Sequence, residues 1–493
     1  MRLKRYLPGL LALTVAGAAF FFYSRDVRRG APFLVSPAEA RAVLNTTQHH
    51  REWVSVPLNP SATMRVFAVY PERADRAPAV IITSKHESAS DWVRASAIRL
   101  AEQGFIAVVP DVLSGLAPNG GDADSFASAS AIADTLHRMN GQERTQRIGA
   151  ARQYAISLAA ANGHTVELEF DANTRRVAIG EHNFSLDASQ DASAFLAKQT
   201  GNHPIAGKNA NVPEDHSMHI GMAMGQGLPP GGANAPMGYP RGKLAELPAG
   251  VFTAHSIVLN SKHRKEFVDI PLGNGKLHTW VEYPDGEGKA PIAIVMQHGP
   301  GMDDWQRALA DQLAQDGFIA IAADLHSGLG PNGGNYDSFQ ATDEVMRATA
   351  RLTPDDMQRR YKTALEWGKK LPRWNGKAAS IGFCMGGGNS FRFAGEVPEL
   401  DAAVSYYGAT PSDEIITKIK APVLAFYGDD DARVTMAAQP TKATMQRLGK
   451  TFEFYIYPHA THGFLEFQDL AGNPAATSDS WKRTIAFLRD HTK

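Results

Sequence analysis

Residues 100–126 read LAEQGFIAVVPDVLSGLAPNGGDADSF, and residues 313–339 read LAQDGFIAIAADLHSGLGPNGGNYDSF. Both belong to a longer repeat, in which residues 78–126 and 291–339 align without a gap and are identical at 24 of 49 positions. Identity at this level over an ungapped stretch indicates an internal duplication rather than chance. The chain of 493 residues therefore contains two related copies, which begin near residues 40 and 255.

Each copy alternates apolar strands with helices. In the second copy an apolar strand at 292–296 precedes a helix over 304–317, and another apolar strand follows at 318–324; the first copy repeats this order. This alternation predicts a doubly wound, mostly parallel α/β sheet. Loops that follow the carboxyl ends of such strands line the ligand crevice. We therefore expect the Pro-Asn-Gly-Gly loops at 118–121 and 331–334 to border the site.

The two copies differ in their second halves. After the repeated stretch, the first copy (residues 40–200) continues with a helical stretch to about residue 161 and a predicted hairpin at 165–180. Its counterpart of the nucleophile turn falls at 178–184, which holds neither cysteine nor serine, so we interpret this copy as a degenerate, non-catalytic module that packs against the second. The second copy, over residues 255–493, is long enough to form a complete domain.

Residues 201–250 separate the copies and are rich in Gly, Pro, Met and His. This composition predicts a linker or an irregular lid. The stretch HSMHIGMAM at 216–224 also contains ligand types that suit copper. The linker is the favoured interpretation, and no metal or cofactor is predicted for the chain.

The amino terminus does not read as part of a globular module. Residues 6–23 are uncharged and largely apolar, with basic residues on both sides. Eighteen such residues can just cross a bilayer as a helix, and a cleaved secretory signal is the alternative. Residues 1–30 are therefore predicted to form a membrane anchor or a signal peptide. The bulk of the chain is expected outside the cytoplasm, at the cell envelope (periplasmic).

Composition excludes several classes of function. Lys plus Arg number 50 and Asp plus Glu 51, so the net charge of −1 offers no electrostatic basis for binding nucleic acid. The single cysteine, Cys384, cannot form a disulfide within the chain, and it rules out a cysteine-rich metal site. What surrounds Cys384 therefore becomes the central question.

A nucleophile turn surrounds this cysteine. The apolar strand 378–381 runs into GFCMG at 382–386, which has the G-x-nucleophile-x-G spacing. The strained turn requires that Gly382 and Gly386 carry no side chain, and the helix that follows directs its N–H groups at the sulfur, which favours thiolate. A buried structural cysteine is the alternative, and the flanking glycines favour the nucleophile.

An acid is expected next along the chain, at the end of a core strand. The apolar strand 421–427 leads into GDDDARV at 428–434, which offers three aspartates. The spacing G-x-x-D-x-x-V selects Asp431 as the orienting acid. Asp429 and Asp430 are interpreted as turn and solvent residues.

The general base should follow in the loop after the next strand. Strand 452–457 leads to HATHGF, where His462 suits a histidine that points back across the sheet edge and His459 suits a surface position. Backbone N–H groups should form the oxyanion hole. We expect one from Met385, directly after the nucleophile, and one from Gly299, in the loop after the first buried strand of this copy.

These motifs resemble the dienelactone hydrolase (carboxymethylenebutenolidase) family, a branch of the α/β-hydrolases. The resemblance rests on GFCMGG, on the aspartate of GDDDARV, on the histidine of ATHGF, and on a buried strand followed by a helix that starts with Asp-Trp. It covers the whole second copy but only the front half of the first. It implies two α/β-hydrolase-like modules, the first incomplete, preceded by the N-terminal hydrophobic helix.

Two features depart from the family pattern. The resemblance implies a His-Glu pair that steers the thiol, but the matching positions read Gln297-His298, so this control is absent or passes to His298 as an active-site neighbour. It also implies two arginines that bind the substrate carboxylate. They would fall near 326–328 and at Glu466, and neither position is arginine.

The sequence therefore predicts a hydrolase that cleaves small-molecule carboxylic esters or lactones through Cys384, His462 and Asp431. Two alternatives remain: acyl transfer to an acceptor other than water, and a catalytically silent binding or scaffold protein at the cell envelope. Association with the membrane is expected through the N-terminal segment.

Overall fold

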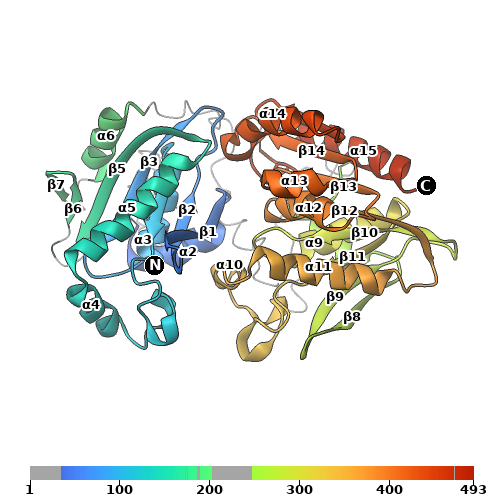
Figure 1. The fold of residues 1–493 in the computed structure, drawn as a ribbon, viewed down its shortest axis with the longest axis horizontal. Helices are drawn as coiled ribbons and strands as arrows, with labels where there is room; N and C mark the ends of the chain where they lie inside the picture. Colours follow the sequence, from blue (N-terminus) through green and yellow to red (C-terminus); the bar gives the residue numbers. More distant parts are fainter. Residues whose placement is uncertain (1–34, 172–173, 175, 186–188, 203–246, 471) are drawn as a thin grey trace, which may run out of the picture.

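The computed structural model describes residues 35–171, 174, 176–185, 189–202, 247–470 and 472–493. The predicted segment 1–30 and the Met/His-rich stretch at 216–224 lie outside the described residues. Two α/β modules lie side by side, the first in blue to green and the second in yellow to red (Figure 1). Among the described helices, none is both long enough and apolar enough to span a bilayer.

The first module is built on a seven-stranded sheet with the order β1-β2-β4-β3-β5-β6-β7. β3 pairs in parallel with β4 and β5, and the remaining pairs are antiparallel. The strands are β1 (Arg51–Asn59), β2 (Ala62–Val69), β3 (Ala77–Ser84), β4 (Ile106–Pro110), β5 (Ala161–Asp171), β6 (Arg176–Ile179) and β7 (His182–Ser185).

The second module is built on an eight-stranded sheet with the order β15-β14-β13-β12-β10-β11-β9-β8. All pairs from β15 to β11 are parallel, and β9 and β8 add two antiparallel strands at one edge. The strands are β8 (Lys265–Leu272), β9 (Gly275–Glu282), β10 (Ala290–Met296), β11 (Ile319–Ala323), β12 (Trp374–Phe383), β13 (Ala402–Tyr406), β14 (Val423–Gly428) and β15 (Phe452–Tyr457).

Helices cover both sheets. Those of the first module are α2 (Pro37–Thr46), α3 (Asp91–Glu102), α4 (Ala129–Arg138), α5 (Gly141–Ser157) and α6 (Ser189–Thr200). Those of the second are α8 (Val251–Asn260), α9 (Asp304–Gln315), α10 (Thr342–Thr349), α11 (Pro354–Gly368), α12 (Met385–Glu396), α13 (Asp413–Lys418), α14 (Ala432–Arg447) and α15 (Asn473–His491).

The apolar strands of the first module place their side chains in two hydrophobic cores, one on each face of the sheet. Alternate residues pack against α2, α3 and α6 on one face and against α5 on the other. β10 and β11 are buried along nearly their whole length, as expected for strands covered on both faces. The predicted helices are confirmed as α3 and α9, each followed by a glycine with positive φ, Gly104 (93°) and Gly317 (100°).

The duplication is visible in the strand order, because β1 to β5 repeat the arrangement of β8 to β12. The first module then ends in the hairpin of β6 and β7, whereas the second continues with three further parallel strands. The predicted hairpin at 165–180 is confirmed. Placing the nucleophile turn of the first copy at 178–184 was wrong, because Ile179 pairs with His182 across a tight antiparallel turn. The counterpart of β12 is β5, which ends at Asp171.

A buried ion pair ties the two modules together. Arg94 of α3 reaches Asp343 of α10 with both terminal nitrogens, Nη2 at 3.0 Å from Oδ2, and both side chains are buried. Asn45 accepts a hydrogen bond from the backbone N–H of Asp343 at 3.0 Å. Ala432, at the start of α14, packs into the core of the first module. The modules therefore share buried contacts.

Removing the charge of Arg94 should destabilise this interface. Arg94→Met removes both hydrogen bonds from Arg94 to the buried Asp343 carboxylate and leaves Arg347, whose Nε lies 3.3 Å from Asp343 Oδ2, as its ion-pair partner. We expect the free energy of unfolding to fall by about 1.5–3 kcal/mol, the range for hydrogen bonds to a charged group. Chemical denaturation followed by tryptophan fluorescence measures the change. Arg99→Met is the control, since Arg99 lies on the same helix but pairs with Glu102 at the surface; its loss should cost less than about 1 kcal/mol. Equal effects of the two variants would contradict the role of the buried pair.

Candidate active site

Cys384 occupies the sharp turn between β12 and α12. Its φ of 54° and ψ of −118° are rare for a residue with a side chain and imply backbone strain. A Cβ on Gly382 would lie 1.9 Å from the carbonyl oxygen of Gly386, and a Cβ on Gly386 would lie 2.0 Å from that of Met296. Both glycines are therefore required, and the turn they permit holds the sulfur at the carboxyl edge of the sheet.

The structure brings Asp431 and His462 to the same edge. Asp431 follows β14 and His462 lies in the loop after β15, so the parallel strands deliver both residues beside β12. His462 Nδ1 lies 2.6 Å from Asp431 Oδ2, and both side chains are buried. A ring nitrogen of His462 lies within 4.8 Å of Cys384 Sγ. The three residues thus lie in a row from carboxylate to imidazole to sulfur, with a hydrogen bond between the first two.

The neighbouring candidates do not join this chain. His459 is exposed, with φ of 58°, and its backbone N–H donates to the Asp429 carboxylate. Asp430 is buried, and its backbone N–H donates to the carbonyl of Ala460 at 3.1 Å. The structure therefore separates the two histidines of this loop, with His462 directed inward and His459 at the surface.

The electrostatics of the site favour an ion pair. Burial raises the pKa of the Cys384 thiol, but His462 and His50 outweigh it and hold this pKa well below its usual value. Burial lowers the pKa of His462, but Asp431 and Cys384 raise it to about 10. Burial likewise opposes the charge of Asp431, and His462 more than compensates, so the Asp431 pKa is lowered. All three pKa shifts are in the direction that favours a thiolate, an imidazolium and a carboxylate in a row.

A small cavity of about 50 Å³ lies at Cys384. Gly299 lines it, and Met385 begins α12 directly after the nucleophile, so the backbone of both predicted oxyanion-hole residues lies near the sulfur. The cavity is lined by Thr47, Gln48, His49, His50, Arg51, His298, Gly299, Pro300, Met346, Cys384, Tyr407, His462, Gly463, Glu466 and Phe467. The expectation that the 118–121 and 331–334 loops border the site was wrong. Each folds back on itself through backbone hydrogen bonds and stays exposed.

His298 lies between two carboxylates at the edge of this cavity. Its Nδ1 is 3.2 Å from Glu466 Oε2, and its Nε2 is 3.1 Å from Asp303 Oδ2. Burial lowers the pKa of His298, but Asp303 and then Glu466 raise it well above its ordinary value. Gln297 turns away, since its side-chain oxygen accepts the N–H of Leu325 at 3.1 Å. Glu466 therefore forms a buried ion pair with His298.

The structure adds a residue that the sequence analysis missed. His50, which immediately precedes β1 of the first module, places Nδ1 3.5 Å from Cys384 Sγ. Its ring centroid lies 4.4 Å from that of His462. A signal was present in the His49-His50 pair, but nothing in the sequence indicated that this end of the first module reaches the nucleophile of the second.

Among the described residues, three groups away from Cys384 bring three side-chain ligand atoms within 4.8 Å of one another, as a metal site would require. They are His263 with Glu282 and Asp311, His298 with Asp303 and Glu466, and Asp429 with Asp430 and His459. In the first two groups the histidines are already hydrogen-bonded to carboxylates. That the chain uses no metal or cofactor stays a prediction.

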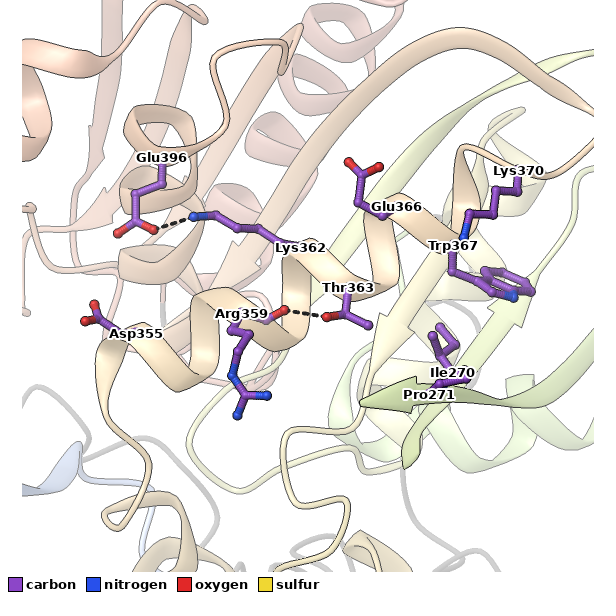
Figure 2. Close-up of a pocket in the computed structure, with 10 residues that line it drawn as sticks. All are labelled: Ile270, Pro271, Asp355, Arg359, Lys362, Thr363, Glu366, Trp367, Lys370 and Glu396. Atoms are coloured by element: carbon purple, nitrogen blue, oxygen red, sulfur yellow. Dashed lines mark hydrogen bonds and ion pairs between the residues drawn. The ribbon is translucent and has the colours of Figure 1, made fainter. Parts of the chain in front are cut away.

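A larger cavity, of about 770 Å³, lies elsewhere on the second module, along α11 and the end of β8 (Figure 2). It shares no lining residue with the cavity at Cys384. Lys362 in its wall pairs with Glu396 at 2.8 Å. Its lining holds neither cysteine nor histidine and includes none of Cys384, His462 and Asp431, so its size does not make it the candidate site.

Comparison with known proteins relates this chain to a family of hydrolases. A protein of Saccharolobus solfataricus named "Putative carboxymethylenebutenolidase" is 28% identical over 233 residues, which covers 41% of this chain and 90% of the relative. A Bradyrhizobium protein named "Probable 2-oxo-3-(5-oxofuran-2-ylidene)propanoate lactonase" is 29% identical over 241 residues, 46% of this chain and 94% of the relative.

A crystal structure titled as a putative dienelactone hydrolase from Klebsiella pneumoniae covers 46% of this chain and 98% of its own, with 25% identity and a TM-score of 0.40. The order and direction of the strands from β8 to β15, with a nucleophile turn after β12, are those of the α/β-hydrolase fold. The family model "Dienelactone hydrolase family" matches residues 64–168 and 277–492, more than half of the chain and parts of both modules. The chain therefore belongs to the dienelactone hydrolase family.

Proposed function

We propose that the protein hydrolyses carboxylic esters or lactones with Cys384 as nucleophile, His462 as general base and acid, and Asp431 as the residue that orients His462. The observation that carries this proposal is the row of buried Asp431, buried His462 and half-buried Cys384 at a glycine-flanked turn. The names of the two relatives, a carboxymethylenebutenolidase and a lactonase, support the same reaction class.

The reaction would proceed in two steps. In acylation, Cys384 Sγ forms a bond with the carbonyl carbon, and the negative charge that develops on the carbonyl oxygen is held by the N–H groups of Met385 and Gly299. His462 donates its proton to the leaving oxygen as the C–O bond breaks. In deacylation, neutral His462 takes a proton from water, the water oxygen attacks the thioester carbon, and the sulfur leaves as thiolate.

The size and charge of the cavity indicate the type of substrate. The cavity at Cys384, of about 50 Å³, is far smaller than the cavity of about 770 Å³ along α11 and suits a small acyl group. Glu466, paired with His298, occupies the position at which the family resemblance implies an arginine. We therefore propose short-chain esters or small lactones, rather than the dienelactone carboxylate itself, as substrates.

Replacing the inward histidine should abolish turnover, whereas replacing its exposed neighbour should not. His462→Asn removes the base, and we expect the kcat/KM for a short p-nitrophenyl ester to fall at least about 10³-fold. His459→Asn is the control, since asparagine tolerates the positive φ at that position, and its activity should stay within about twofold.

Cys384→Ala should be as inactive as His462→Asn, and mass spectrometry should detect an acyl adduct on Cys384 of the unmodified protein. Ester hydrolysis retained in Cys384→Ala would remove the cysteine as nucleophile.

The reactivity of Cys384 should persist at low pH. Because His462 and His50 hold its pKa well below the ordinary value, the thiolate is lost only when the pH falls below that lowered pKa. The rate of alkylation by iodoacetamide should therefore reach half its maximum well below pH 8.5, the usual pKa of a free thiol. In His462→Asn, burial remains while an imidazolium is gone, so the half-maximum should move upward. A half-maximum near pH 8.5 in the unmodified protein would contradict the ion pair.

We also propose that residues 1–30 take the chain to the cell envelope, with both modules outside the cytoplasm, since residues 6–23 are uncharged and largely apolar. In a Gram-negative host, protease added after permeabilising the outer membrane should cleave the full chain. A variant without residues 1–30 should remain protected. Protection of the full chain in the same assay would overturn this location.

A further inference from the structure

We propose that the two modules build the catalytic centre jointly, with His50 of the first module donating a hydrogen bond from Nδ1 to the thiolate of Cys384. This inference rests on the proposed function, in which Cys384 is the nucleophile. Under this proposal the first module does more than pack against the second module: it also contributes one residue, His50, to the catalytic centre.

The geometry surrounds the sulfur with two imidazoles. His50 Nδ1 lies 3.5 Å from Cys384 Sγ, and His50 is 8% exposed, so little water competes for this contact. On the far side of the ring, His50 Nε2 lies 3.8 Å from Glu52 Oε2, and Tyr70 Oη donates to Glu52 Oε1 at 2.9 Å. Each imidazole that faces the sulfur is thus backed by a carboxylate: Glu52 behind His50, and Asp431 behind His462.

The duplication supplies an internal comparison for His50. The carbonyl of His50 accepts the N–H of Tyr70 at 3.0 Å, and the carbonyl of Arg264 accepts the N–H of Tyr283 at 2.9 Å, so the two residues occupy the same place in their modules. The tyrosine–glutamate pair is also present in both copies, since Tyr283 Oη donates to Glu266 at 3.0 Å. Arg264, however, is 69% exposed and faces no active site. The imidazole is therefore specific to the copy that abuts the thiol.

The first module contacts the rest of the machinery as well. Glu72 Oε2 accepts the backbone N–H of His462 at 3.1 Å. The carbonyl of Arg73 accepts the N–H of Ala432, the residue after Asp431, at 3.1 Å. Five consecutive residues, 47–51, line the cavity at Cys384. The first module therefore covers the sulfur and braces the loops that carry the base and the acid.

The chemistry assigns His50 a part in both steps. An N–H donated to sulfur stabilises the resting thiolate, which is the attacking species. In deacylation the C–S bond breaks and its electron pair stays on sulfur, so the same hydrogen bond stabilises the leaving thiolate. Loss of His50 should therefore reduce the thiolate fraction at neutral pH and slow the breakdown of the acyl-enzyme.

Several charged or titratable groups besides His50 act on the Cys384 thiol. Their effects on the pH dependence of its alkylation must be separated from the effect of His50. The groups whose charge is coupled to that of Cys384 are His462, Arg51, Tyr407, Glu466 and Arg433. The variants below leave all of them in place.

The test uses the full chain with two substitutions of His50 and one control. His50→Leu keeps apolar volume but removes the donor, whereas His50→Asn places an amide N–H near the position of Nδ1. Arg264→Leu is the control, because it changes the equivalent residue of the second module, outside the site. The pH dependence of Cys384 alkylation and the steady-state and burst kinetics with a short p-nitrophenyl ester are measured for each.

We expect His50→Leu to shift the half-maximal pH of alkylation upward and to lower kcat/KM at pH 7 about 10- to 100-fold, the range for a hydrogen bond to a charged group. Acyl-enzyme should accumulate in a more pronounced burst. His50→Asn should recover part of both effects, and Arg264→Leu should match the unmodified protein.

Unchanged alkylation and kinetics in His50→Leu would overturn the shared site while leaving the proposed function intact. A hydrolytically active Cys384→Ala would instead defeat the proposed function, and the alkylation profile of His50→Leu would still report on the contact. If His50→Leu does not fold, Glu52→Gln provides the second variant: an upward shift of the alkylation profile supports the shared site, and no shift overturns it.

Discussion

The turn at Cys384 is the constraint on which the site depends. A residue with a side chain is held at φ 54° between a strand and a helix, and the chain can close this turn only because Gly382 and Gly386 have no Cβ to meet the neighbouring backbone. The strain is offset by the packing of β12 within a parallel sheet and by the helix that follows. Its result is a sulfur fixed at the carboxyl edge of the sheet, where the loops after β14 and β15 also end.

Burial shapes the chemistry at this edge. A thiolate, an imidazolium and a carboxylate are each expensive to remove from water singly, but in a row each stabilises the next. Because the first module covers the cavity, water screens these charges little, and they act on one another strongly. The same enclosure limits the space available to substrate. Protection of the charges and the small size of the cavity are thus two consequences of one interface.

The duplicated modules differ in the strands that position Asp431 and His462. Both copies keep the first five strands in the same order, but Asp431 and His462 follow β14 and β15, for which the described residues of the first module hold no counterpart. Its hairpin of β6 and β7 closes the sheet instead. The first module retains the segment before β1 and the loop after β2, which bring His50 to Cys384 and Glu72 to the backbone of His462. A shortened copy can therefore contribute single residues without being a catalytic unit itself.

The local sequence determined much of the fold and of the candidate site. Apolar strands, glycine-terminated helices and the GFCMG turn predict the α/β sheets, and the spacings around Asp431 and His462 single out residues that the structure brings together, because chain order and parallel strands dictate where those loops end. Only the tertiary structure could show that the loops at 118–121 and 331–334 turn away from the site and that His50 approaches Cys384. The contact between His50 and Cys384 joins residues 334 positions apart in two different modules. It depends on how their surfaces pack, for which neither periodicity nor motif spacing carries a signal.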